Sequence, residues 1–384
     1  MNSYKRVLFV TKDDPFGIGG GCFATHSYLK AFSELCNGNI DVFLNAGIKT
    51  DLSIQVNNYF FTQARGVFSR IGSIFSGELH RHTKPVLEKL LKSDTKYDLC
   101  VFNNSKVSTG LINPVKRKGI RVVTIHHNVE PEYVRDNTPN CVKRALMLKH
   151  VTKAEKMSYL LSDFNLFLTQ QDMESFHQLY GKCKGKEGVI GTFEVNNLPE
   201  LKVKEIAPDH LIFAITGSLC TVQGVDGIVY FFEELYKFIP KSAEIIISGR
   251  RPTPTVIDYC NKHNNVRLVA NPDDMAEIIN QSDIYICPTR LGGGLKLRVM
   301  DGLKLGIPVI THSCSARGYD AFLEGDYLTV FNNGNEFGKK LEKQIKMIKE
   351  GKLSRKEVRK RYEDLFSYET GYKRVESLLY EDHI

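Results

Sequence analysis

The sequence predicts an α/β protein built from two parallel sheets, each with helices on both faces. Short apolar runs alternate with helical patterns along most of the chain, which is typical of parallel sheets. The pattern breaks between residues 193 and 209, where Pro199 and Pro208 indicate a linker. A chain of 384 residues is long enough for one domain on each side of that linker. A ligand is then expected in a cleft between the two domains.

The composition narrows the class of protein. Nine cysteines at wide spacing, with no Cys-x-x-Cys pair, argue against a disulfide framework or a zinc site and favour a reducing compartment. No apolar run approaches the roughly 20 residues of a membrane span, and the start of the chain does not read as a signal peptide, so we expect a cytoplasmic protein. The net charge of +8 allows anionic partners, but it is too dispersed to indicate nucleic acid.

The first domain opens with a buried strand over residues 6–11 and a glycine-rich loop that ends in Gly19, Gly20 and Gly21. A helical pattern from Phe23 to Leu35 follows, so this is a strand, glycine loop and helix. Further strands are predicted over 99–102, 122–125 and 163–168, with helices over 155–161 and from Thr169 to about Tyr180.

Two histidines follow the strand at 122–125. His126 and His127 stand where parallel sheets place their chemistry, at the carboxyl end of a buried strand. The alternative for either ring is a structural hydrogen bond to a backbone carbonyl. Sequence alone leaves both explanations open.

Residues 59–92 combine large apolar residues at helical spacing with interleaved cations. One explanation is a helix packed on its own sheet, which is the commoner case, and the other is a face that lies in a membrane interface. The apolar residues are Phe60, Phe61, Ala64, Val67, Phe68, Ile71, Ile74, Phe75 and Leu79, and the cations are Arg65, Arg70, Arg81 and Lys84. We therefore consider peripheral membrane contact through residues 60–84.

The second domain repeats the strand and helix alternation. Strands are predicted over 211–216, 244–248, 266–269, 284–287 and 308–311, and helices over 224–238, 254–262, 273–280 and 295–305. Three further helices are predicted in the tail, over 335–350, 354–365 and about 368–382.

The segment from Cys287 to Ile310 has the features of an anion site. Its strand is followed by Gly292, Gly293 and Gly294 and then by a helix. The first backbone N–H groups of a helix lack internal partners, and its dipole favours an anion there. Lys296 and Arg298 would be unfavourable in that first turn unless an anion is held nearby. The alternative is an ordinary tight loop before a core helix.

This segment resembles the donor site of retaining glycosyltransferases of the GT-B architecture, specifically family 4 (group 1). The residues in register are Pro288, Arg290, Gly292, Gly294, Gly306, Pro308 and Val309. Arg298 stands where the family usually has Lys, and Asp301 where it usually has Glu. Gly19, Gly20 and Gly21 match the family's N-terminal loop, which faces the acceptor and the donor phosphates. The resemblance is strong over 211–320 and looser over 5–195.

The resemblance implies two Rossmann-like domains that face an interdomain cleft. Residues 1–200 would form the acceptor-side domain, 201–366 the nucleotide-sugar donor domain, and 367–384 a helix that crosses back to the first domain. His126 would line the reaction centre, with His127 as second choice. The donor would contact Ser218, Gln223, Arg250, Arg290, Gly292, Gly293, Gly294, Leu295, Lys296, Arg298 and Asp301, the last through the ribose hydroxyls.

Three positions depart from the best-known subgroup of this family. Ser218 and Gln223 stand where many members carry Arg and Lys, and Gly293 stands where a Glu is common. Two phosphates require positive compensation, which Lys296 and Arg298 would supply, with Arg250 or Arg290 as further candidates. The alternatives are a solvated lysine at 296 and a salt bridge from Arg298 to Asp301.

The resemblance therefore implies retaining transfer of a sugar from a nucleotide sugar to a hydroxyl of a glycan or lipid-linked glycan, in cell-surface polysaccharide synthesis. No Asp-x-Asp motif occurs, so no metal or other cofactor is expected. One alternative is a non-catalytic sugar-nucleotide-binding or partner protein on the same fold, which the departures at 218, 223 and 293 favour. Another is a sugar-nucleotide epimerase of the same architecture.

Overall fold

The structure is a computed structural model of the chain. It describes residues 4–17, 19–45, 53–62, 71–72, 75–78, 80–92, 94–196, 198–202, 207, 209–323 and 325–380. The chain divides into two compact units. The first comprises Met1–Asn197 and Phe366–Ile384, and the second comprises Leu198–Leu365.

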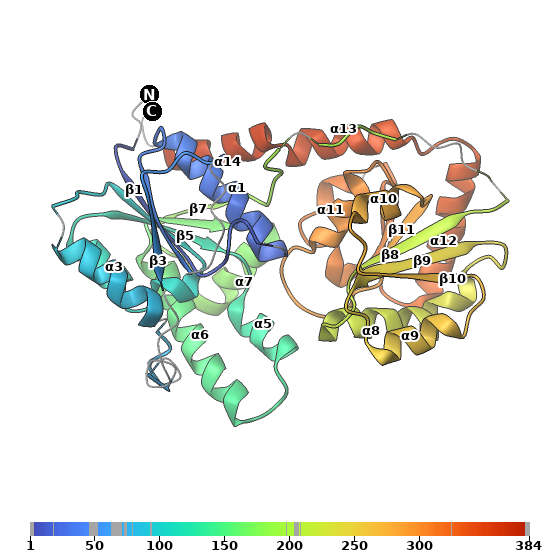
Figure 1. Cartoon of the computed structure of the whole chain (residues 1–384), viewed down its shortest axis with the longest axis horizontal. Coiled ribbons are helices and arrows are strands. Elements are labelled where there is room, and N and C mark those ends of the chain that lie inside the picture. The colour runs from blue at the N-terminus through green and yellow to red at the C-terminus, as the bar shows by residue number, and fades with distance from the viewer. Residues whose placement is uncertain are drawn as a thin grey trace. The chain divides into compact units, whose positions relative to one another are not determined.

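The first unit is a seven-stranded parallel sheet with the strand order β3-β2-β1-β4-β5-β6-β7 (Figure 1). Its strands are β1 (Val7–Thr11), β2 (Ile40–Asn45), β3 (Asn58–Thr62), β4 (Leu99–Asn103), β5 (Arg121–His126), β6 (Phe164–Phe167) and β7 (Lys186–Val189). Its helices are α1 (Gly20–Leu35), α3 (His80–Lys92), α4 (Ile112–Arg117), α5 (Glu130–Asn137), α6 (Val142–Leu161), α7 (Gln170–Tyr180) and α14 (Tyr368–Tyr380), with a short 3₁₀ helix, η1 (Ser105–Ser108).

Successive side chains of β1 point to opposite faces of the sheet, and the core of this unit has one layer on each face. Val7 and Phe9 pack in one layer with α1 and α14, whereas Leu8 and Val10 pack in the other with α3 and α4. All five residues of β1 are buried, because side chains of a parallel strand covered on both sides meet a helix on each face. The C-terminal helix α14 therefore belongs to the core of the first unit, and it packs against α1.

The second unit is a six-stranded parallel sheet with the order β10-β9-β8-β11-β12-β13. Its strands are β8 (Ile212–Ser218), β9 (Glu244–Arg250), β10 (Val266–Ala270), β11 (Ile284–Cys287), β12 (Val309–His312) and β13 (Leu328–Phe331). Its α-helices are α8 (Val222–Tyr230), α9 (Pro254–Asn261), α10 (Met275–Asn280), α11 (Leu297–Leu303), α12 (Gly334–Lys349) and α13 (Arg355–Phe366). The short helices are η2 (Phe231–Leu235, a π-helix), η3 (Tyr236–Phe238), η4 (Ser313–Ser315) and η5 (Asp320–Phe322).

The structure corrects the interpretation of residues 59–92 as one helical stripe. Phe60 and Phe61 lie on the edge strand β3, whereas residues 71–72 and 75–76 are helical and the helix α3 begins at His80. Phe60 stacks on Phe43 at 4.8 Å between ring centroids, so it packs within the first unit. Phe61, Ile71 and Phe75 are exposed by 45%, 44% and 74%. Other members of the stripe lie outside the described residues, namely Ala64, Arg65, Val67, Phe68, Arg70, Ile74 and Leu79, and the side chains of Arg81 and Lys84 do as well.

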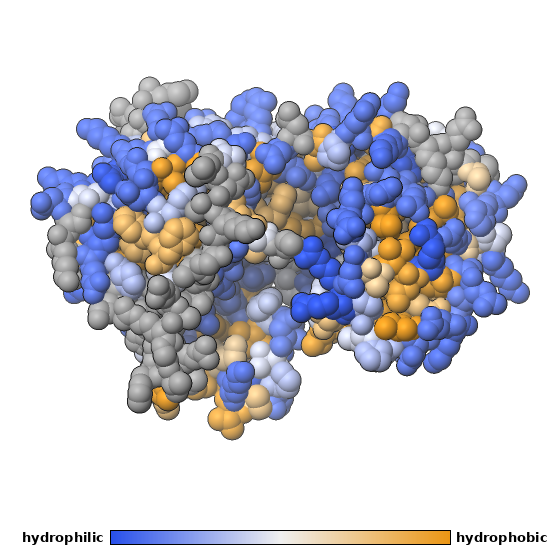
Figure 2. All heavy atoms as spheres, viewed as in Figure 1, coloured by the Kyte–Doolittle hydropathy of each residue, from blue (hydrophilic) through white to orange (hydrophobic). Residues whose placement is uncertain are grey.

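Polar and charged residues cover most of the described surface on the face drawn in Figure 2, with apolar residues in smaller groups between them. Among the described residues, none of the helices combines the length and the hydrophobicity that crossing a bilayer requires.

Candidate functional site

In the second unit, the candidate site lies where the strand order reverses. Strands β9 and β10 lie on one side of β8, and β11, β12 and β13 lie on the other. The connections after β8 and β11 therefore leave the same edge of the sheet in opposite directions, which opens a crevice at the carboxyl ends of these strands. The loop after β11 carries Gly292, Gly293 and Gly294, and the loop after β8 starts at Ser218. The fold thus brings the two predicted donor segments together.

Lys296 bridges these two segments. Its Nζ donates to the backbone oxygen of Gly293 at 3.1 Å and to Oε1 of Gln223, in the first turn of α8, at 3.4 Å. Gly292 lies beside this contact with a φ of +85°, a backbone conformation that favours glycine. The predicted helix start is corrected slightly: α11 begins at Leu297, so Lys296 is its N-cap residue and Leu295 lies in the loop.

Arg298, in the first turn of α11, reaches the end of β8. A Cβ on Gly217 would lie 2.3 Å from Cζ of Arg298, so the guanidinium lies directly against the bare backbone of this glycine. Its Nη1 donates to Oγ1 of Thr289 at 3.1 Å. Among the described residues, the carboxylate of Asp301 pairs with Lys304 at 3.0 Å instead of with Arg298. The Arg298–Asp301 salt bridge considered from the sequence is therefore not formed.

Arg290 has a different environment from the other two cations. Its guanidinium donates two hydrogen bonds to the carboxylate of Asp226, both of 3.0 Å, and lies over the ring of Tyr230 at 4.5 Å from the centroid. Both partners belong to α8. Bidentate pairing and stacking use the planar face and the fork of the arginine together, so this residue fastens the glycine loop to α8.

The remaining predicted donor residues lie at the same edge of the sheet. Ser218 is the last residue of β8 and its Oγ lies 3.4 Å from Sγ of Cys220. Arg250 is exposed at the end of β9, where its carbonyl accepts from the N–H of Leu219 at 3.1 Å. Gly294 has a φ of +73°, which favours glycine, and Gly293 offers its carbonyl to Lys296.

Side chains after β12 hold the glycine loop from its other side, and no motif in the sequence predicted them. Sγ of Cys314 donates to the backbone oxygen of Gly292 at 3.2 Å, and Oγ of Ser315 donates to that of Thr289 at 2.7 Å. The hydroxyl of Tyr319 donates to the carbonyl of Lys296 at 2.8 Å. Burial, with the nearby carboxylate of Asp301, raises the pKa of Tyr319 well above its ordinary value, so this donor keeps its proton.

In the first unit, the strand order also reverses, at β1 and β4, and polar side chains gather at that edge. Thr11 ends β1, Asn103 ends β4, and His127 directly follows β5. The helix α1 begins here at Gly20, with Gly19 as its N-cap residue at a φ of +135°. The predicted glycines of the first loop and one of the two predicted histidines thus belong to one cluster.

His127 is held within this cluster by an amide. Its Nε2 lies 2.7 Å from Oδ1 of Asn103, and its ring meets the ring of Tyr28 edge to face at 5.8 Å between centroids. Burial and the charge of Lys12 together lower the pKa of His127 to about 4, and Glu130 opposes the shift. The imidazole is therefore neutral at neutral pH.

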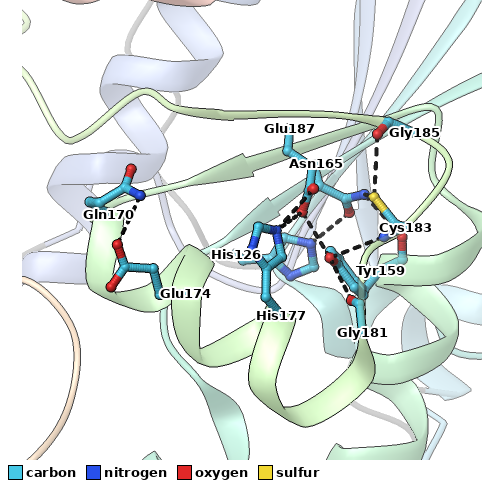
Figure 3. Close-up of polar contacts among 10 residues, drawn as sticks. All are labelled: His126, Tyr159, Asn165, Gln170, Glu174, His177, Gly181, Cys183, Gly185 and Glu187. Atoms are coloured by element: carbon cyan, nitrogen blue, oxygen red, sulfur yellow. Dashed lines mark hydrogen bonds and ion pairs between the residues drawn. The ribbon is translucent and has the colours of Figure 1, made fainter.

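His126 lies in a different environment, and Figure 3 shows its contact with Asn165. Its Nε2 lies 2.9 Å from Oδ1 of Asn165, and its ring packs on Phe167 and Phe176 at 5.0 and 4.5 Å between centroids. Its Nδ1 is buried with no hydrogen-bond partner among the described residues. Burial lowers the pKa of His126 to about 4. The structural explanation considered from the sequence therefore fits His126, with an amide partner in place of a backbone carbonyl.

Within the described residues, no group of three or more His, Cys, Asp or Glu side chains is arranged to hold a metal ion.

Part of the second unit matches a known family. Residues 210–346 match the family model described as "Glycosyl transferases group 1". This match covers the segment 287–310 and supports its resemblance to group 1 glycosyltransferases. A search of curated proteins found no match.

Solved structures extend the likeness to the whole chain. Sucrose-phosphate synthase from Thermosynechococcus elongatus superposes with a TM-score of 0.73 at 13% identity, over 98% of each chain. A glycosyltransferase from Rickettsia africae gives 0.71 at 14% identity over 99% of each chain. HepE from Anabaena in complex with UDP gives 0.69 at 14% identity, over 98% of this chain and 100% of that one. The predicted fold, two Rossmann-like domains of the GT-B architecture, is confirmed.

Proposed function

We propose that this chain is a retaining glycosyltransferase that moves a sugar from a nucleoside diphosphate sugar to a hydroxyl of a glycan or lipid-linked glycan, in the synthesis of a cell-surface polysaccharide. The observation that carries the proposal is the pair of cations, Lys296 and Arg298, held over the glycine backbone at the strand-order reversal of the second unit. A group 1 glycosyltransferase domain spans the same residues, and a structural neighbour was solved with UDP.

The two cations stand next to the positions where the usual charges are missing. Nζ of Lys296 contacts both Gln223 and Gly293, and the guanidinium of Arg298 lies against Gly217, the neighbour of Ser218. The positive charge that the first loop lacks is thus supplied from the second loop. With the N–H groups of Gly292 to Gly294, these side chains would stabilise the diphosphate as it leaves the sugar.

The other donor residues take supporting roles in this proposal. Asp301 would exchange its pairing with Lys304 for the ribose hydroxyls, and Ser218, Gln223 and Arg250 would line the crevice. Arg290 would hold the loop through Asp226. Because the diphosphate charge is met by side-chain cations, and no Asp-x-Asp motif occurs, the transfer is proposed to need no metal.

For the reaction centre we choose His127 over His126. Hydrogen bonds through Asn103 and Thr25 connect His127 to Gly21 at the start of α1. His126, by contrast, packs on Phe167 and Phe176. A neutral imidazole can accept a hydrogen bond from a sugar hydroxyl and orient the transferred group without adding charge.

A second candidate is a sugar-nucleotide-binding protein without transferase activity. The observation that favours it is the engagement of Arg290 by Asp226, which removes one arginine from the set that could face phosphate. Catalysis would then rest on fewer cations than in the best-known subgroup.

One experiment separates these candidates. The purified chain is incubated with a panel of nucleoside diphosphate sugars, with EDTA present throughout, and release of the nucleotide is measured with and without glycan acceptors. A transferase releases nucleotide from a particular donor and faster with acceptor. Calorimetric binding of a donor without release identifies the binding protein, and interconversion of the donor sugar identifies an epimerase.

We also propose a cytoplasmic protein that contacts the membrane peripherally through residues 60–84. The support is the exposure of Phe61, Ile71 and Phe75 in this stretch. Such contact would bring the first unit to a lipid-linked acceptor.

A further inference from the structure

The amide of Asn103 lies at the centre of a hydrogen-bond chain whose direction is fixed by its two ends. Oγ1 of Thr25 donates to the carbonyl of Gly21 at 2.7 Å, and Oγ1 of Thr11 donates to that of Asp13 at 3.2 Å. A threonine hydroxyl carries one proton, so a hydroxyl that donates to a carbonyl can only accept from its other neighbours. Both hydroxyls are therefore acceptors toward Asn103.

This direction determines how the amide of Asn103 is oriented. Its Nδ2 lies 2.7 Å from Oγ1 of Thr25 and 3.1 Å from Oγ1 of Thr11, and it donates to both. Its Oδ1 then faces His127, at 2.7 Å from Nε2. The reverse orientation would place an amide oxygen against two hydroxyls whose protons point elsewhere.

The orientation of the amide in turn determines the tautomer of His127. An amide oxygen only accepts, so Nε2 of His127 must carry the proton. A neutral ring has one N–H, and Nδ1 is left with a lone pair. This nitrogen forms no hydrogen bond with the described residues, while the ring is only 7% exposed and packed against Tyr28.

We propose that Asn103 is a positioning residue that fixes His127 in the Nε2–H tautomer, so that Nδ1 accepts a hydrogen bond from a hydroxyl of the transferred sugar. The proposal rests on the proposed function, in which His127 contacts that sugar. It defines the ligand group as a hydrogen-bond donor, because a lone pair on Nδ1 is unable to bind a carbonyl or carboxylate oxygen. A sugar that lacks the hydroxyl would leave this acceptor without its ligand hydrogen bond.

The chain offers a matched control. Asn165 contacts Nε2 of His126 through its Oδ1, in the same way that Asn103 contacts His127, but it lies in the core of the same unit. Changes at Asn165 remove an amide from a buried histidine without touching the proposed site. They separate loss of packing from loss of tautomer control.

The first measurement needs no substrate. In protein labelled with ¹⁵N-histidine, the ¹⁵N NMR spectrum distinguishes a protonated imidazole nitrogen from one with a lone pair. The signals of His127 are identified by their loss in His127→Gln. We expect Nδ1 without a proton in the wild type and a mixture of tautomers in Asn103→Ala. A wild-type Nδ1–H form overturns the proposal even if Asn103→Ala does not fold.

The second measurement is kinetic. Asn103→Ala should lower kcat by about 10- to 100-fold with a smaller change in KM, because a misplaced contact costs mainly turnover. Asn165→Ala, which removes the matching amide from His126, should keep kcat. Equal kcat values for Asn103→Ala and the wild type, or an equal loss in Asn165→Ala, overturn the proposal. If no donor is turned over, the proposed function fails, and the spectrum still decides the tautomer.

Discussion

The contact between Gly217 and Arg298 allows the proposed phosphate site to be tested from a residue that carries no side chain. A Cβ at position 217 would lie 2.3 Å from Cζ of Arg298, whereas ordinary van der Waals contact begins at 3.4 Å. The substitution Gly217→Ala therefore forces the guanidinium to move by about 1 Å. Since hydrogen bonds weaken steeply with distance and angle, a displaced guanidinium would lose its aligned bonds to a phosphate.

The size of the effect follows from the bonds at stake. A hydrogen bond to a charged group contributes about 1.5–3 kcal/mol, so Arg298→Ala should weaken nucleoside diphosphate binding roughly 10- to 150-fold. Gly217→Ala should cause a large part of the same loss. It should also cost about 1–3 kcal/mol of stability, because the φ of Gly217 is +149°, a region that residues with a Cβ rarely adopt.

Calorimetric titration with UDP and other nucleoside diphosphates measures the change in affinity, and urea unfolding measures the change in the free energy of unfolding. Gly351→Ala is the matched control in the same unit, because Gly351 also has a positive φ, +68°, but no atom lies within 4 Å of its added Cβ. It should lose stability and keep its affinity.

A double-mutant cycle provides the decisive comparison. If Gly217→Ala acts by moving Arg298, it should cost little further affinity in the Arg298→Ala background. Unchanged affinity in Gly217→Ala would refute the displacement. Full additivity would show that Gly217 acts without Arg298, and unchanged affinity in Arg298→Ala would exclude a direct contact between that guanidinium and phosphate.

Three further outcomes are expected. His127→Ala should lower kcat for nucleotide release much more than donor affinity, whereas His126→Ala should mainly lower the urea midpoint; the opposite pattern would return the reaction centre to His126. Burial lowers the pKa of each histidine from 6.5 to about 4, so the unfolded chain binds more protons in this range. The free energy of unfolding should be highest above pH 6.5 and fall by about 3 kcal/mol per histidine toward pH 4, and urea unfolding of His126→Gln should show a shallower pH slope. Finally, the chain should co-sediment with anionic liposomes and dissociate at high salt. Binding that is independent of lipid charge and salt concentration would exclude electrostatic docking through residues 60–84.

The buried strands were predictable because parallel strands covered on both faces form continuous apolar runs. β11 was predicted at its observed bounds, and β8 and β9 were predicted to within two residues. The edge strands β3 and β7 were missed, since their residues are only partly buried. The apolar run of β2 is interrupted in the sequence by Asp41. This carboxylate is fully buried and bonded to Arg6 and Tyr97, partners that only the fold supplies.

The choice between the two histidines shows where sequence information ends. Consecutive residues at the end of a strand point to different sides, so a shift of one position exchanges a core residue for one in the polar cluster. Asn103 and Asn165, which distinguish the two environments, lie on other strands. The sequence identified the pair, and strand pairing was needed to choose between its members.

The missing charges at 218, 223 and 293 lead to one conclusion from the sequence and to another from the structure. Along the chain, Ser218, Gln223 and Gly293 suggest a site that has lost its affinity for phosphate. In the fold, one ammonium contacts both Gln223 and Gly293, and the guanidinium of Arg298 lies on the residue before Ser218. The hydroxyl of Tyr319 donates to the backbone carbonyl of Lys296, and Oγ1 of Thr289 accepts from Arg298, so both residues are fixed at these positions. Cations placed at the positions where the usual charges are missing favour a site that still binds an anion over one that has lost it.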